Sequence, residues 1–254
     1  MARIIAVANQ KGGVGKTTTV VSLATALADL GERVLAVDLD PQAGLTFSLG
    51  IDPEDLERSI HEVLVAGMPT AQVIVPTDDG VWLLPATLEL ASTEAQLFAM
   101  SLGREQVLRK ALAPIADNYD TILLDCSPSL GIITINALTA ANDVLIPLQC
   151  ETLSHRGVGQ LLQTVDMVRD LTNPTLHVIG VLPTLFDGRT LHARSVLNNI
   201  SESYDIVVLD PPIARSIRFA EAPAVGRSAL AISDDLPGVV AYKEHARRLH
   251  ASEI

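Results

Sequence analysis

The sequence predicts an α/β fold in which a twisted, mostly parallel sheet carries helices on both faces. Three observations predict it. Short aliphatic runs alternate with segments of helical spacing along the 254 residues, which is the element order of parallel sheets. Hydrophobic residues make up 48% of the chain and aromatic residues only 3%, so the core is aliphatic, as in strands buried on both faces. A glycine-rich turn follows the first aliphatic run and opens a helical segment.

The first elements follow directly from their residue patterns. Residues 3–9 form a short apolar run and are predicted to be a buried strand. From Lys16 onward, apolar residues recur at helical spacing, and Gly31 is predicted to end that helix. Residues 33–40 are predicted to be the second strand. Together these elements form a βαβ unit, whose crossover we expect to be right-handed.

The remainder of the chain continues the alternation. Further helices are predicted at residues 52–65, 103–119, 130–142, 157–171, 191–203 and 239–249. Further strands are predicted at residues 81–86, 121–125, 143–149, 176–184 and 204–210. Because the sequence contains neither an internal repeat nor an obvious linker, residues 1–254 are predicted to form a single domain.

Charge and composition narrow the functional classes. A net charge of −12 argues against a globally basic nucleic-acid binder, but it leaves room for a local basic patch. The two cysteines, Cys126 and Cys150, do not suggest a disulfide framework. The apolar run near the N-terminus is too short for a signal peptide, and no apolar stretch has the length of a membrane span. We therefore expect a cytoplasmic protein.

The turn at residues 9–19, NQKGGVGKTTT, resembles a phosphate-binding loop with two departures. The standard pattern G-x-x-x-x-G-K-[ST] would place a glycine at Gln10, and the loop carries an extra lysine, Lys11. Glycines allow backbone N–H groups to point at an anion, and the following helix adds the positive end of its dipole. We expect Gly12, Gly13 and Gly15 to supply the tight conformations. The predicted fold is therefore that of the P-loop NTPases.

Specific roles follow from positions in the loop. Lys16 is expected to pair with the β- and γ-phosphates, Thr17 to hold Mg²⁺ and Thr18 to bond the α-phosphate. Asp125, at the carboxyl end of a predicted strand, is expected to hold Mg²⁺ through water. Asp210 occupies a similar local sequence and is the less favoured alternative. The predicted nucleotide-binding residues are Lys11, Gly12, Gly13, Val14, Gly15, Lys16, Thr17 and Thr18.

Several motifs together resemble the ParA/Soj-type partition ATPases, in the deviant-Walker branch of P-loop proteins. They cover nearly the whole chain, and the most specific are the double-lysine loop and DLDPQ at residues 38–42. The others are LLDCSPSLG at 123–131, NALTAAN at 136–142, VLIPLQCE at 144–151 and RFAEAP at 218–223. Departures from the usual pattern occur at Ser127, at residues 151–157 and at residues 213–216, and they do not change the residues expected to carry the phosphate chemistry.

This resemblance implies an ATP- and Mg²⁺-dependent ATPase whose catalytic residues are Lys11, Lys16 and Asp40. Lys11 would reach the partner subunit's nucleotide across a homodimer that sandwiches two ATP molecules. Asp40 would orient the attacking water, and we expect Asp38 to lie on the opposite side of its strand. The alternative for Asp40 is that it only caps the turn before Pro41. A second lysine in the loop agrees with this interpretation. A cation supplied by the second subunit would couple dimer formation to the presence of the triphosphate.

The resemblance also implies partners. The ATP-bound dimer would bind DNA of the nucleoid without sequence preference, and a ParB-type centromere-binding protein would stimulate hydrolysis, so that chromosomes or plasmids are segregated. The DNA-binding arginines would be Arg189 and Arg218, with Arg194, Arg215 and Arg227 nearby in sequence.

Three related branches remain as alternatives. A MinD-like protein would bind a membrane through an amphipathic C-terminal helix, but residues 241–254 lack a broad face of large apolar side chains, so no membrane partner is expected. A cargo-positioning relative would have the same ATPase. A nitrogenase-reductase-like protein would share an iron–sulfur cluster, whereas Cys126 and Cys150 are flanked by apolar strand ends and are interpreted as buried thiols.

Overall fold

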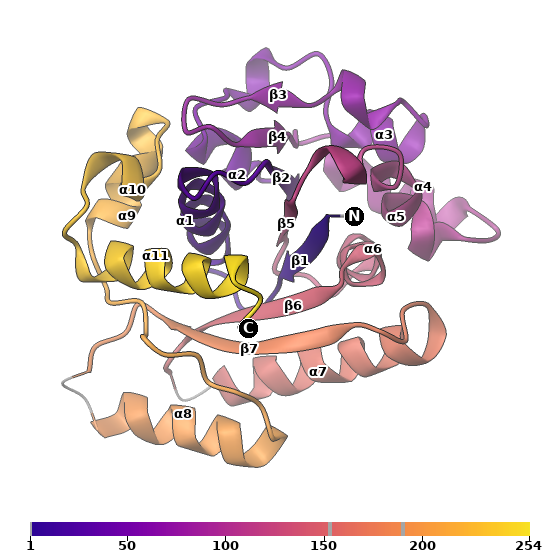
Figure 1. Ribbon diagram of the computed structural model, residues 1–254. Helices are drawn as coiled ribbons and strands as arrows, with labels where there is room; N and C mark the ends of the chain where they lie inside the picture. The colour runs from indigo at the N-terminus through magenta and orange to yellow at the C-terminus, as the bar shows by residue number, and fades with distance from the viewer. Residues whose placement is uncertain (1, 152–153, 189–190) are drawn as a thin grey trace.

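The predicted parallel sheet is present in the computed structural model, which describes residues 2–151, 154–188 and 191–254 (Figure 1). Seven strands form one sheet in the order β3-β4-β2-β5-β1-β6-β7. They are β1 Arg3–Val7, β2 Val34–Leu39, β3 Val75–Pro76, β4 Trp82–Leu84, β5 Thr121–Cys126, β6 Asp143–Gln149 and β7 His177–Thr184. Only the pairing of β3 with β4 is antiparallel, so the prediction of a mostly parallel sheet is confirmed.

Helices connect the strands and cover the sheet. The α-helices are α1 Lys16–Asp29, α2 Gly44–Ser48, α3 Ile60–Val65, α4 Leu90–Ala99, α5 Val107–Leu112, α6 Ile132–Ala140, α7 Ser154–Leu171, α8 Leu191–Tyr204, α9 Arg218–Glu221, α10 Ala229–Ile232 and α11 Pro237–His250. The 3-10 helices are η1 Pro53–Asp55, η2 Thr70–Gln72, η3 Arg104–Gln106, η4 Ala116–Asn118 and η5 Ala222–Val225. In the described part of the chain, no helix combines the length and the apolar character needed to cross a membrane.

Strand alternation divides the core into two clusters, one on each face of the sheet. In β2, Leu35 and Val37 face one cluster, while Val34 and Ala36 face the other. The first cluster lies under α3 to α8, and the second lies under α1, α10 and α11. Figure 1 shows α1 and α11 on one side of the central strands and α6 on the other. Helices on both faces are therefore confirmed.

The helix predicted at 103–119 and the strand predicted at 204–210 differ from the structure. The helix predicted at 103–119 is broken into η3, α5 and η4, and Pro114, which lacks the N–H that a continuous helix would need, lies between α5 and η4. The strand predicted at 204–210 is wrong. Helix α8 continues through Tyr204, and only Val208 forms a bridge, to Val181 of β7, before Pro211 and Pro212 remove two backbone donors.

Several elements between β2 and β5 were not revealed by periodicity, and neither were the short helices α9 and α10 after β7. Helices α2 and α4 and strand β3 were not predicted, and the helix predicted at 52–65 is split into η1 and α3. Ser59 starts α3 with a capping box. The Ser59 side chain accepts a backbone N–H of the first turn, and the Glu62 carboxylate accepts the backbone N–H of Ser59.

The strand order places the carboxyl ends of β1, β2 and β5 side by side. Val7 of β1 and Asp38 of β2 both lie opposite Asp125 of β5. The loop that follows β1 therefore meets the acidic carboxyl ends of β2 and β5. Open α/β sheets bind ligands at the carboxyl ends of their strands.

Candidate nucleotide site

The loop after β1 adopts the cradle that its glycines predict. Gly13 and Gly15 have φ angles of +73° and +85°, which side chains with a Cβ rarely adopt. Gly15 is also the N-cap of α1, so the loop ends at the positive end of that helix. Gly12 differs from the expectation, because its φ is not positive. A Cβ built at Gly12 would meet no atom within 4 Å, so this position faces open space and does not require a glycine for steric reasons.

Three contacts that the sequence did not reveal hold the loop in place. Asn9 donates from Nδ2 to the Pro147 carbonyl at 2.7 Å, and its Oδ1 accepts the Lys11 N–H at 3.0 Å. The hydroxyl of Thr184, at the end of β7, donates to the Val14 carbonyl at 2.6 Å. The loop is thus fixed to β6 and β7. Asn9 had one local signal, as the first polar residue after an apolar strand, whereas Thr184 had none.

Lys16 points into the loop. Its side chain is buried, and Nζ donates to the Lys11 carbonyl at 3.2 Å. Burial lowers the pKa of Lys16, while Asp125 opposes that shift. A buried ammonium group without a carboxylate in direct contact is well placed to meet an anion that enters the loop.

Lys11 points to a different place. Its Nζ forms an ion pair with Glu151 Oε2 at 2.5 Å, and the two side chains are 33% and 53% exposed. The pairing lowers the pKa of Glu151, first through the hydrogen bond from Lys11. Glu151 follows β6, far along the chain from the loop, so no local pattern could have revealed the contact. The two lysines of the loop therefore have separate surroundings.

Thr17 and Asp125 come together as predicted for a metal site. The Thr17 hydroxyl donates to Asp125 Oδ2 at 2.7 Å. Asp125 is buried, and among the residues that the structure describes its Oδ1 has no hydrogen-bond partner. Burial, followed by repulsion from Asp38, raises the pKa of Asp125 well above its ordinary value. A hydroxyl beside an unsatisfied buried carboxylate fits a hydrated Mg²⁺ ion, which prefers hard oxygen ligands. Asp210, the alternative, is exposed.

Asp38 is not where we expected it. Residues two apart in a strand share a face, and Asp38 lies on the α1 face with Val34 and Ala36. Its Oδ1 accepts the Asp40 N–H at 3.1 Å, and its Oδ2 accepts the Thr46 N–H at 2.8 Å and hydroxyl at 2.7 Å. Burial raises the pKa of Asp38 to about 6, although these hydrogen bonds oppose the shift. Asp38 thus anchors the turn that carries Asp40.

Asp40 both caps a turn and faces the site. Its Oδ1 accepts the Gln42 N–H at 3.0 Å, which is the capping contact considered as its alternative role. The residue also lines a cavity of about 340 Å³ together with the phosphate loop. Other lining residues are Gly12, Gly13, Gly15, Lys16, Thr17, Thr18, Pro128, Leu185, Ser216, Phe219 and Ala220. Of the predicted loop residues, Lys11 and Val14 do not line this cavity, and Val14 is buried beneath the loop.

The arginines considered for DNA binding have different surroundings. Arg218 begins α9, beside the cavity-lining Phe219. It is exposed and pairs with Glu221 at 3.0 Å. Arg227 pairs with the buried carboxylate of Asp79 at 2.5 Å, and that ion pair fixes its guanidinium within the fold. Arg215 is exposed. Arg189 lies outside the described residues, as does the side chain of Arg194.

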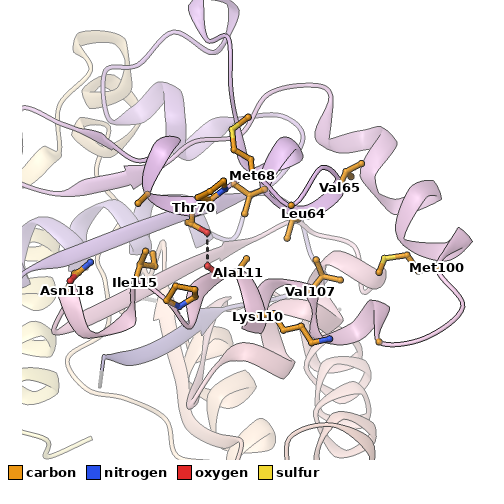
Figure 2. A pocket seen from close by; sticks show the side chains of 16 residues that line it. Leu64, Val65, Met68, Thr70, Met100, Val107, Lys110, Ala111, Ile115 and Asn118 are labelled. Carbon is orange, nitrogen blue, oxygen red and sulfur yellow. Dashed lines mark hydrogen bonds between the residues drawn. The ribbon is translucent and has the colours of Figure 1, made fainter.

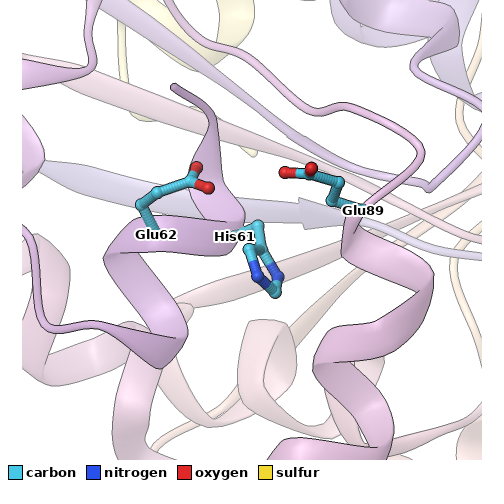
Figure 3. A group of neighbouring side chains, drawn as sticks. All are labelled: His61, Glu62 and Glu89. Atoms are coloured by element: carbon cyan, nitrogen blue, oxygen red, sulfur yellow. The ribbon is translucent and has the colours of Figure 1, made fainter. Parts of the chain in front are cut away.

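One group of possible metal ligands lies elsewhere. Figure 3 shows the carboxylates of Glu62 and Glu89 facing one another, with the ring of His61 turned aside. Potential ligand atoms of the three side chains lie within 4.8 Å of one another. Glu62, however, accepts the Ser59 N–H at 2.7 Å, and His61 Nδ1 lies 2.8 Å from the Thr93 hydroxyl. We therefore assign Glu62 and His61 to holding α3 in place.

Comparison with known proteins places this site in a wider context. A family model described as an AAA domain matches residues 2–178. The sporulation initiation inhibitor protein Soj of Bacillus subtilis is 40% identical over 253 residues, which covers 99% of this chain and 100% of that protein. The chromosome partitioning protein ParA of Caulobacter vibrioides is 39% identical over 254 residues, covering 99% of this chain and 95% of that protein.

A solved structure is also similar. The crystal structure of cobyrinic acid a,c-diamide synthase from Mycobacterium smegmatis, with bound ADP and magnesium, has a TM-score of 0.89 and 49% sequence identity. The match covers 100% of this chain and 96% of that one.

Proposed function

This chain belongs to the family of ParA and Soj partition ATPases, and from that premise we propose that ATP switches it from a monomer to a homodimer that binds DNA. It is an ATPase that converts ATP and water to ADP and phosphate with Mg²⁺. The proposed dimer binds nucleoid DNA without sequence preference, and a ParB-type partner stimulates its hydrolysis. The proposed outcome is the partition of chromosomes or plasmids.

The observation that carries this proposal is the separation of the two loop lysines. Lys16 is buried and turned into its own loop, whereas the Nζ of Lys11 lies at the surface on Glu151. Lys11 therefore contributes no side chain to the cavity of its own subunit. A half-exposed ion pair contributes little to stability. A triphosphate on a second subunit can thus draw Lys11 away from Glu151 at little cost.

The proposed chemistry uses side chains whose positions are fixed. Lys16 and the backbone N–H groups of the loop hold the phosphates, and Thr17 and Asp125 would hold Mg²⁺, which neutralises charge on the phosphate oxygens when bound. Asp40 orients a water molecule for in-line attack on the γ-phosphate. Asp38 positions Asp40 by accepting its backbone N–H at 3.1 Å.

Asp40→Ala is expected to bind ATP and dimerise but to hydrolyse ATP at least about 100-fold more slowly, because the water loses its orienting carboxylate. Phosphate release under saturating ATP measures this loss. Asp52→Ala is the matched control, since Asp52 also accepts an N–H two residues on, that of Glu54, at 3.0 Å but lies outside the cavity. Equal rates in the two variants would reduce Asp40 to a turn cap.

Asp125→Asn is expected to stabilise the nucleotide-free protein and to remove its response to Mg²⁺. Because the pKa of Asp125 is raised, the folded state holds this proton more tightly than the unfolded chain does. The folded state therefore loses stability as the pH rises above 3.8, the ordinary pKa of an aspartate. We expect Tm at pH 7.5 to rise, and in a chain of this size each kcal/mol of added stability corresponds to about 2–4 °C.

The same melting experiment tests the metal. In the wild type, ATP with Mg²⁺ should raise Tm more than ATP with a chelator, and Asp125→Asn should lose that difference. Asp210→Asn, at the exposed alternative position, should keep it. If Asp125→Asn retains the full Mg²⁺ response, Asp125 has no part in holding the ion.

Arg218→Glu is expected to lose DNA binding at least about tenfold while ATP-dependent dimerisation is unchanged, because the substitution reverses a charge that would meet phosphate. Arg247→Glu is the matched control. Both arginines are 58% exposed and pair at 3.0 Å with a glutamate three residues away. Gel shifts at low and moderate salt measure the effect, and equal losses in both variants would exclude a specific role for Arg218.

The proposed function as a whole is tested by DNA binding of the wild type with ATP, with ADP and without nucleotide. We expect binding with ATP only, and binding that weakens steeply with salt, since counterion release dominates non-specific association. Binding of equal strength in all three states would contradict the ATP switch.

A MinD-like membrane role is disfavoured by the packing of α11. Val239, Tyr242 and Leu249 of α11 are buried in the core cluster that also contains residues of α1, while Val240 is exposed. Tyr242 further bonds Thr19 of α1 at 2.9 Å. Membrane binding by α11 would require this face to leave the core. A cargo-positioning protein would use the same ATPase. The DNA-binding experiment distinguishes it from a partition protein only if the cargo-positioning protein moves on a surface other than DNA.

The similarity to the cobyrinic acid a,c-diamide synthase structure raises amide synthesis as another activity. Taking ammonia from glutamine commonly needs a cysteine thiolate. Burial raises the pKa of Cys150 to about 11, and it raises the pKa of Cys126 still further. Burial thus shifts the pKa of both thiols away from the lowered pKa of an activated cysteine, which disfavours this activity for the chain.

A further inference from the structure

An apolar groove lies between α3 and α5, on the face of the sheet opposite α1 (Figure 2). We call it the α3–α5 groove, and its volume is about 600 Å³, a size typical of binding sites. The side chains that matter here are Leu64, Val65, Met68, Met100, Val107 and Ile115. Figure 2 shows these side chains coming from both walls.

The groove is part of the built fold. The hydroxyl of the buried Thr70, on one side of the groove, donates to the Ala111 carbonyl of α5 at 2.6 Å and so ties η2 to the opposite wall (Figure 2). Leu64 and Ile115 belong to the main core cluster beneath it. A hydrogen bond and shared core packing therefore link the two walls of the groove.

Exposed apolar side chains extend the groove beyond its walls. Val65 and Met100 at its edge are 37% and 40% exposed, and Phe98 and Leu102 just beyond it are 56% and 88% exposed. Gathered apolar exposure of this kind marks interaction surfaces. Because the apolar surface runs out of the groove onto the loop after α4, it suits a polypeptide segment better than a small enclosed molecule.

The charge at the groove is a single cation. Lys110 is the one charged residue among those lining it. Three of the four lysines in the sequence have polar partners: Lys11 contacts Glu151, Lys16 a backbone carbonyl, and Lys243 Asp234. Over the described residues, Lys110 has no such partner and is exposed. An unpaired cation beside an apolar groove complements an acidic group on a partner.

We propose that the α3–α5 groove docks an amphipathic helical segment of another protein, whose apolar side chains fill the groove and whose carboxylate pairs with Lys110. Helix-in-groove recognition uses apolar side chains at helical spacing. Met68 and Met100 suit it, because flexible thioether side chains adapt to the shape of a docked helix.

This surface is separate from the nucleotide site. Asn118, at one end of the groove, immediately precedes the segment that enters β5, whereas Asp125 lies at the far end of that strand. Six strand residues span roughly 15–20 Å. Docking in the groove therefore leaves the phosphate loop and Lys11 uncovered, and the proposal stands or falls independently of the ATP switch.

The test begins with selection. The wild-type protein with ADP serves as bait for a displayed library of short helical peptides with randomised side chains, and Met100→Glu serves as counter-bait. We expect enriched peptides to carry apolar residues at helical spacing and at least one acidic residue. No enrichment over the counter-selection, or enrichment of basic peptides, would overturn the proposal.

Binding of an enriched peptide is then measured by fluorescence anisotropy. Lys110→Glu and Met100→Glu should each weaken it at least about tenfold. The matched controls Lys243→Glu and Met167→Glu should not, since Met167 is an exposed methionine (54%) on α7. Equal affinity for groove and control variants would place the peptide elsewhere.

Methyl NMR of methionine locates the contact directly, because the chain has only four methionines. The signals of Met68 and Met100 should shift on addition of the peptide, while that of Met167 stays in place. A shift of Met167 alone contradicts the proposal. So does a result in which decanoate, a simple apolar acid, shifts Met68 and Met100 while peptides do not, since the groove would then be a small-molecule site.

Discussion

Lys11→Ala is expected to bind ATP with wild-type affinity, to remain monomeric and to lose ATP turnover by about a thousandfold or more. Lys11 lies outside its own cavity and on the surface, so its removal leaves the phosphate cradle of Lys16 intact. The large effect comes from the partner's site, because cations supplied in trans to a transferring phosphoryl group contribute about 10³–10⁵ in rate. Fluorescent-nucleotide binding, sedimentation velocity and phosphate release measure the three properties.

Two controls separate the trans role from the loss of an ion pair. Lys243→Ala removes a lysine that is similarly half-buried and paired, with Asp234 at 2.6 Å, and should behave as wild type. Glu151→Gln breaks the Lys11–Glu151 pair but keeps the lysine, and it should still dimerise with ATP. A Glu151→Gln protein that fails like Lys11→Ala would mean that the pair itself, and not a trans contact, is what matters.

Lys16→Ala is expected to weaken ATP binding at least about 100-fold, and with it every later step. The ammonium group is buried at the base of the loop and supplies the main positive charge of the cavity. Charge-assisted contacts to phosphate are strong, and in a buried setting their loss is not replaced by solvent. Isothermal titration with ATP and Mg²⁺ measures the affinity, and circular dichroism checks the fold. ATP affinity near that of the wild type would reject the assignment of the loop.

Together the two variants define different failures. Lys16→Ala should have an empty site in its own subunit, whereas Lys11→Ala should have a filled site and no partner. Mixing the Lys16→Ala and Lys11→Ala proteins offers a further contrast. The Lys16→Ala subunit has an empty site but an intact Lys11, and the Lys11→Ala subunit has a filled site but no Lys11.

Local sequence patterns predicted the elements that build the site. The aliphatic runs of β1, β2, β5, β6 and β7 were long enough to be recognised, and the glycines of the loop marked its turn. Patterns failed where other forces decide. Pro114 broke a predicted helix, and a strand predicted at 204–210 had room for only one bridge, at Val208.

Contacts between distant residues were beyond sequence reasoning. Glu151 pairs with Lys11, and Thr184 bonds Val14, across most of the chain. Thr46 bonds Asp38 across the turn after β2, on a short helix that periodicity did not reveal. The face on which Asp38 lies, by contrast, could have been predicted from the sequence, because side chains two residues apart in a strand lie on the same face. The wrong expectation for Asp38 was therefore an error of reasoning.

The proposed ATP switch depends on a nucleotide-dependent dimer that needs Lys11. Sedimentation velocity of Asp40→Ala tests it, because slow hydrolysis keeps ATP in place throughout the run. We predict a dimer with ATP and Mg²⁺, a monomer with ADP, and a monomer in both when Lys11→Ala is added to Asp40→Ala. A double variant that still dimerises with ATP, or a single variant with the same mass under both nucleotides, would contradict the switch.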